Sequence, residues 1–148
     1  MINTNKMKVV AKRYLLKLKS KHSKMKHIKY DEISCQRYLT DARLSPSEAK
    51  ILFKLRTRMY PVKINFKNKI QNYGQNLNCE ICQVEQCDQK HLLNCYVLKN
   101  LVPELKNTKV SYGDIFSKNI NKMVKAAKLF STVDKARKNY LTMKANNN

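Results

Sequence analysis

The sequence CEICQVEQCDQKHLLNC, residues 79–95, contains four side chains that can bind one metal ion. They follow the spacing C-x2-C-x8-H-x3-C, and the candidate metal ligands are Cys79, Cys82, His91 and Cys95. Three thiolates and one imidazole are the ligand set of a closed tetrahedral zinc site, which keeps no open position for a reactive water. The spacing therefore predicts one structural Zn²⁺ ion as the cofactor.

The local sequence also predicts how these ligands converge. The first two ligands fit a tight turn, and the second two lie four residues apart, so that they share one face if their segment is helical. Asp88 is well placed to cap that helix. We expect the helix to continue from His91 to about Leu101 and to stop at Pro103, which cannot continue it.

Cys87 is the main ambiguity of the predicted site, because a shift of register would let it replace one of the ligands. Two of the cysteines can also be disulfide partners, or simply buried apolar side chains. Neither alternative explains a histidine and a cysteine one helical turn apart just after C-x2-C, so metal binding is favoured. The middle interval is longer than that of a retroviral zinc knuckle, and base reading by such a turn is not predicted.

The composition indicates a partner with negative charge. Among 148 residues there are 31 Lys and Arg but 10 Asp and Glu, which gives a net charge of +21. Such an excess predicts attraction to nucleic acid or to an anionic membrane. A genome rich in A and T favours lysine codons, but it does not equally explain the shortage of acidic residues.

Targeting signals are not evident in the sequence. The N-terminus lacks the apolar run of a signal peptide, and no stretch approaches the ~20 apolar residues of a membrane span. We expect an intracellular protein. Residues 1–29 carry ten cations and no acid, with a basic helix predicted over 7–20. This arm is typical of a nucleic-acid contact or a nuclear-import signal; a solvated tail and a membrane-surface helix are the alternatives.

The clearest helix start is the sequence Ser-Pro-Ser-Glu at 45–48, where Ser45 is the predicted N-cap of a helix over 46–60. Its candidate nucleic-acid contacts are Lys50, Lys54, Arg56 and Arg58. Three of them form a row in which each lies one turn from the next, and Arg56 interrupts the other, apolar side. An ordinary solvated face is the alternative for that row. We expect the apolar side to hold Ala49, Leu52, Phe53 and Met59.

The remaining elements complete a mainly α prediction. Val62, Ile64 and Phe66 alternate with polar residues, which predicts a short strand or extended segment. A long helix follows from Ser117 or Asn119 as cap to about residue 142. The predicted domains are a basic arm over 1–29, a small zinc-stapled helical domain over 30–142, and a disordered tail over 143–148.

Several segments also resemble one known family. In order along the chain they are Tyr38 with Leu39, RLSPSEAKILFKLRTRM (43–59), VKINFKN (62–68), CEIC with DQKHLLNC (79–95), SYGDIFS (111–117) and KAAKLFSTV (125–133). Together they resemble the C-terminal zinc-binding tail of non-LTR retrotransposon polyproteins, which follows the reverse transcriptase. The resemblance covers roughly residues 30–140. It implies a small domain that helps the element protein engage its RNA or target DNA, with the metal role on the four ligands named above.

Enzymatic activity is not predicted. The sequence Tyr-Gly-Asp-Ile at 112–115 is not the Tyr-x-Asp-Asp that holds two metals in a reverse transcriptase, and no glycine-rich phosphate loop occurs. We predict a zinc-stabilised module that binds RNA or DNA mainly through phosphates, with aromatic side chains available for stacking on unpaired bases. The alternatives are a zinc-stapled module that binds an acidic protein, and a non-functional relic of a retroelement.

Overall fold

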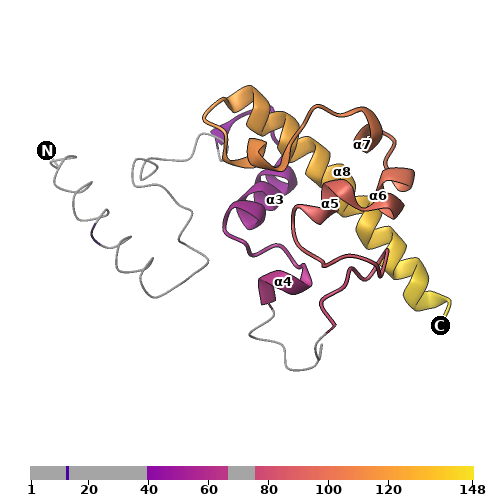
Figure 1. The fold of residues 1–148 in the computed structure, drawn as a ribbon. Helices are drawn as coiled ribbons and strands as arrows, with labels where there is room; N and C mark the ends of the chain where they lie inside the picture. The colour runs from indigo at the N-terminus through magenta and orange to yellow at the C-terminus, as the bar shows by residue number, and fades with distance from the viewer. Residues whose placement is uncertain (1–12, 14–39, 67–75) are drawn as a thin grey trace, which may run out of the picture. The chain divides into compact units, whose positions relative to one another are not determined.

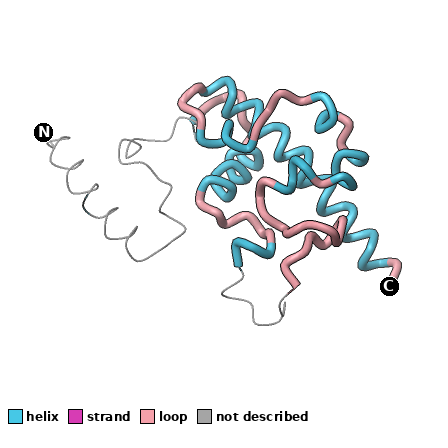
Figure 2. Tube along the Cα trace, in the orientation of Figure 1, coloured by secondary structure: helices cyan, strands magenta, loops and turns pink. Residues whose placement is uncertain are grey.

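The computed structural model describes residues 13, 40–66 and 76–148 of the chain (Figures 1 and 2). Helices are the main secondary structure of these residues. The elements are α3 (Pro46–Arg56), α4 (Lys63–Phe66), α5 (His91–Asn94), α6 (Tyr96–Leu101), α7 (Glu104–Asn107), the 3-10 helix η4 (Tyr112–Phe116) and α8 (Ile120–Asn146). The predicted mainly α fold with a long C-terminal helix is confirmed. The basic helix predicted over 7–20 lies outside the described residues, except for position 13.

The α8 helix is the element on which the others pack. Figure 1 shows it running the length of the domain, and α3, α6 and η4 contact it. Its buried apolar side includes Met123, Val124, Ala127, Phe130 and Val133. The largest fully buried side chains of the described residues come from most of these segments, and they are Tyr60, Phe130, Leu52, Leu55, Leu92, Leu98, Ile115, Val62, Val133, Cys87 and Cys95.

The ends of α8 show one prediction met and one missed. Asn119 is the N-cap, and its side chain accepts a hydrogen bond from the backbone N–H of Asn121 at 3.0 Å. The helix continues to Asn146, although the sequence predicted an end near Thr142 and disorder after it. No proline or glycine stands in those last residues to stop a helix that is already formed.

The α3 helix begins as predicted and ends earlier. Ser45 is its N-cap, with Oγ accepting from the N–H of Glu48 at 3.2 Å. The helix ends at Arg56 instead of continuing to residue 60. Arg58 adopts a φ of 54°, its N–H donates to the carbonyl of Leu55, and the next N–H donates to the carbonyl of Lys54 at 2.7 Å. This pair of bonds is the Schellman motif that closes a helix C-terminus.

The strand predicted at 62–66 is wrong, because Lys63–Phe66 forms the short helix α4. Val62 is buried, but Ile64 and Phe66 are only partly so, and the alternation therefore does not create one buried face. The Asn65 N–H donates to the carbonyl of Val62 at 3.0 Å. The N–H of Ile64 donates to the carbonyl of Cys87 at 3.2 Å, so one backbone bond joins α4 to the chain after the C-x2-C turn. The described residues contain no strand with which the segment could form a ladder.

Candidate metal centre

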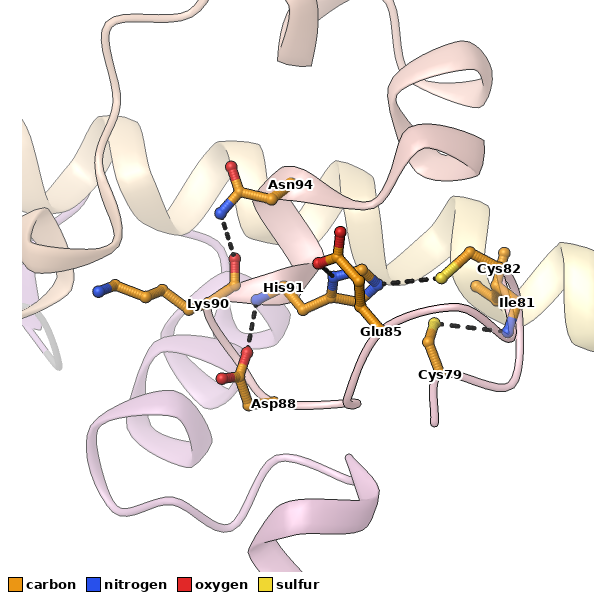
Figure 3. A network of polar contacts seen from close by, with 8 residues as sticks. All are labelled: Cys79, Ile81, Cys82, Glu85, Asp88, Lys90, His91 and Asn94. Carbon is orange, nitrogen blue, oxygen red and sulfur yellow. Dashed lines mark hydrogen bonds and ion pairs between the residues drawn. The ribbon is translucent and has the colours of Figure 1, made fainter. Parts of the chain in front are cut away.

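The four predicted ligands meet in one buried cluster. The candidate ligand atoms of Cys79, Cys82, His91 and Cys95 all lie within 4.8 Å of one another. A tetrahedral zinc ion with bonds of about 2.0–2.3 Å holds its ligand atoms roughly 3.3–3.8 Å apart, so a small adjustment would close the cluster on an ion. Figure 3 shows Cys79, Cys82 and His91 converging from the turn and from α5.

The C-x2-C turn is held by backbone bonds on both of its sides. The N–H of Cys79 donates to the carbonyl of Glu85 at 2.7 Å, and the N–H of Cys87 donates to the carbonyl of Leu77 at 2.8 Å. These two bonds flank an isolated antiparallel bridge between Asn78 and Gln86. The chain thus turns back on itself after the first two ligands and returns beside them.

Inside this turn, a backbone N–H also donates to the sulfur of the first ligand. The N–H of Ile81 points at the Sγ of Cys79 at 3.4 Å (Figure 3). Gln83, directly after the second ligand, has a φ of 60° and donates its N–H to the carbonyl of Cys79 at 2.9 Å. Donors aimed at a sulfur stabilise the thiolate, which is the form that binds a metal.

The second pair of ligands lies on either side of a break between two helices. Asp88 accepts a hydrogen bond from the N–H of His91 at 2.7 Å and so caps the turn that leads into α5, although the helix itself begins only after Lys90 (Figure 3). The continuous helix predicted through residue 101 is wrong, because Cys95 has a ψ of 120° and separates α5 from α6. Cys95 is fully buried. The break changes the helix direction at the position of the fourth ligand.

The imidazole of His91 is oriented from both of its nitrogens. Nε2 lies 3.3 Å from the Sγ of Cys82, inside the cluster, and Nδ1 lies 3.1 Å from a carboxylate oxygen of Glu85 (Figure 3). With the proton on Nδ1, the ring donates to the carboxylate and presents the lone pair of Nε2 to the cluster. A carboxylate behind a ligating histidine is a common feature of metal sites, where it fixes the tautomer and raises the basicity of the ring.

Cys87 lies against the first ligand but is not one of the four clustered residues. The pKa of Cys79 is lowered to about 4, first because Cys87 donates to its sulfur and further because backbone N–H groups do so. The same hydrogen bond and burial raise the pKa of Cys87. Burial raises the pKa of Cys95 to about 11. A bound cation would replace the proton of Cys95, and the donor set fits a thiophilic divalent metal.

The turn is anchored to α8 by contacts that the sequence did not reveal. Arg137 is buried on α8, donates to the carbonyl of Pro61 at 3.0 Å and lies 3.8 Å from the carboxylate of Glu80, between the first two ligands. Farther along α8, the Nζ of Lys144 donates to the carbonyl of Glu80 at 3.4 Å. The sequence does not indicate these roles for Arg137, because its partners are distant along the chain.

A buried polar pair supports this anchor. The hydroxyl of Tyr60 donates to a carboxylate oxygen of Asp134 at 2.6 Å, and Lys138 pairs with the other oxygen at 2.9 Å. The guanidinium of Arg137 lies 5.8 Å from the centroid of the Tyr60 ring. Burial, followed by the bond to Asp134, raises the pKa of Tyr60. Tyr60 is therefore a neutral phenol in the folded protein.

The predicted nucleic-acid residues fall into two groups in the structure. Lys50 and Arg58 are exposed and Lys54 is half-buried, so the row of three reaches the surface. Arg56 is only 8% exposed. Its guanidinium donates to the carbonyl of Ile115 at 3.3 Å and lies 6.0 Å from the centroid of the Phe116 ring. Arg56 therefore holds η4 against α3, and we remove it from the candidate phosphate contacts.

Comparison of the chain with protein-family models, with curated proteins and with solved structures found no match. The resemblance to retrotransposon tails rests on the sequence motifs and stays a prediction. None of the helices in the described ranges combines the length and the apolar content that a membrane span requires.

Proposed function

We propose that Cys79, Cys82, His91 and Cys95 bind one structural Zn²⁺ ion, and that the domain stabilised by this ion binds RNA or DNA mainly through phosphates. The observation that carries the first half is the buried convergence of three sulfurs and one imidazole. Burial of all four ligands leaves little room for a substrate, which favours a structural role over a catalytic one. A retrotransposon origin and an intracellular location are parts of the same proposal.

The exposed face of α3 supports the second half. It presents Lys50, Lys54 and Arg58, and the one acidic residue of the helix, Glu48, is turned toward α8, where its carboxylate lies 3.2 Å from the Nζ of Lys128. The cations of this face are thus not neutralised by an acid on the same helix. Phosphate contacts by Lys and Arg supply most of the affinity in sequence-independent binding.

The test measures affinity for duplex DNA against salt concentration in two matched variants of the full chain. One variant replaces Lys50, Lys54 and Arg58 with Gln. The control replaces three exposed lysines of α8, namely Lys122, Lys125 and Lys135. Each phosphate contact contributes about −0.9 to the slope of log affinity against log salt. We expect the α3 variant to flatten the slope by roughly 2–3 units and the α8 variant to flatten it by less.

The two variants lose the same charge, and both keep the basic arm over 1–29, so a difference between them reports on position alone. Equal flattening would mean that net charge binds and that α3 is not the contact surface. If the zinc-loaded wild-type chain has no measurable affinity for duplex or single strands at low salt, the nucleic-acid function is wrong. The protein-interaction module, with an acidic partner, would then take its place.

A further inference from the structure

Two large apolar side chains stand on the surface of α3 beside its cations. Phe53 is 48% exposed and Met59 is 47% exposed. The sequence predicted both on the buried side of the helix. The structure instead buries Ile51, Leu52 and Leu55, which lie on the opposite side of α3 from Phe53.

The helical register places two cations beside the exposed ring. Lys50 precedes Phe53 by three residues and therefore lies one turn away on the same face. Lys54, the next residue, points about 100° round the helix from Phe53, on the same side as Lys50. The Schellman motif returns the chain over the last turn of the helix, and this brings Arg58 and Met59 to the same end of α3. We call these five residues, Lys50, Phe53, Lys54, Arg58 and Met59, the α3 face.

Single exposed apolar residues are common on protein surfaces and need no special account. The α3 face differs because a flat ring is combined with three cations and with no acid from its own helix. Glu48 is directed to Lys128 and Arg56 is turned inward to Ile115. A membrane surface would require a broad apolar side, whereas here two apolar groups lie beside three cations.

We propose that the α3 face binds single-stranded nucleic acid, with one unpaired base stacked on Phe53 and the flanking phosphates on Lys50, Lys54 and Arg58. This inference rests on the proposed function and specifies its substrate class. In a duplex the faces of the bases are covered by base stacking, so the Phe53 ring could contact only the backbone and the edges of the bases in the grooves. An unpaired strand offers both a base face and phosphates, which is the combination that aromatic and basic surfaces bind.

The experiment measures fluorescence anisotropy of the full-length zinc-loaded chain with a labelled single strand of about 12 nucleotides, and with the duplex of the same sequence. Phe53→Ala should lower the single-strand affinity by about 5- to 100-fold and leave the duplex affinity nearly unchanged. Phe53→Tyr keeps a ring and should bind the single strand like the wild type. The matched control is Leu101→Ala on α6, where the leucine is 46% exposed, and it should change neither affinity.

The outcomes separate this inference from the function on which it rests. If Phe53→Ala weakens single strand and duplex alike, or weakens neither, the stacking proposal is wrong. It is also wrong if Leu101→Ala has the same effect as Phe53→Ala. In these cases the nucleic-acid function still stands, provided that the Gln variant of Lys50, Lys54 and Arg58 lowers the salt slope. If the wild type binds neither probe, both proposals fail. Zinc content and melting temperature, measured on each variant, confirm that the domain is folded.

Discussion

Replacing Arg56 with Ala tests the most specific change that the structure makes to the sequence-based account. The guanidinium is buried, and it donates to the carbonyl of Ile115 at 3.3 Å and contacts the sulfur of Met123 at 3.7 Å. Removing a buried donor and leaving its acceptor unpaired costs about 1–3 kcal/mol. The lost stem of the side chain adds a cavity term. We expect Arg56→Ala to lower the free energy of unfolding by about 2–4 kcal/mol.

The assay is urea unfolding of the zinc-loaded chain, with the salt dependence of duplex binding measured on the same samples. Arg58→Ala is the matched control, because it removes the same side chain two residues away from an exposed position. It should change stability by no more than about 0.5 kcal/mol and flatten the salt slope by about 0.9. Arg56→Ala should leave the slope of the folded protein unchanged. The reasoning would be refuted by an Arg56→Ala variant with wild-type stability and a slope flattened by about one unit.

Three further predictions concern the metal, the helix end and the buried phenol. Chelation should remove hydrogen-exchange protection from residues 79–101 more than from residues 120–146, because structural zinc couples on the order of 10 kcal/mol of binding to local folding; equal protection with and without chelator would contradict this. Arg58→Gly should raise the free energy of unfolding by about 0.5–1 kcal/mol, because glycine accepts the positive φ without strain, while nucleic-acid binding weakens; a loss of stability in urea unfolding would count against it. Tyr60→Phe should cost about 1–3 kcal/mol by leaving one carboxylate oxygen of Asp134 without its donor. Folding raises the pKa of Tyr60, so this contribution to stability is complete below the ordinary tyrosine pKa of about 10 and is lost as the pH rises above it. The difference in unfolding free energy between wild type and variant should therefore be constant at neutral pH and shrink in alkali.

Features set by neighbouring residues were predictable from the sequence. The ligand spacing, the caps at Ser45, Asp88 and Asn119, and the apolar period of α8 each depend on groups within a few positions along the chain. A capping side chain needs only the N–H groups two or three residues ahead of it. For the same reason the sequence indicated the four ligands, which lie close together along the chain, but not the contacts that support them.

Features set by distant residues were not predictable. Arg56 contacts Ile115 and Arg137 contacts Pro61, which lie 59 and 76 residues away along the chain. Because an arginine is usually exposed, Arg56 was predicted to contact phosphate, and nothing in the sequence indicated a buried role for Arg137. The same error at Arg56 shifted the expected buried side of α3. Arg56 is buried together with Leu52 and Leu55, and Phe53 is therefore exposed. The break at Cys95 coincides with a fully buried side chain, and helix propensity alone does not indicate it.

The identity of the atoms around the metal is the measurement that tests the central claim most directly. X-ray absorption at the zinc edge of the reduced, zinc-loaded protein reports the number and type of ligand atoms. We predict one zinc per chain with three sulfurs at about 2.3 Å and one nitrogen at about 2.0 Å, unchanged in Cys87→Ser. A shell of four sulfurs, in which Cys87 replaces His91, or a Cys87→Ser variant that no longer holds zinc, would contradict the assignment.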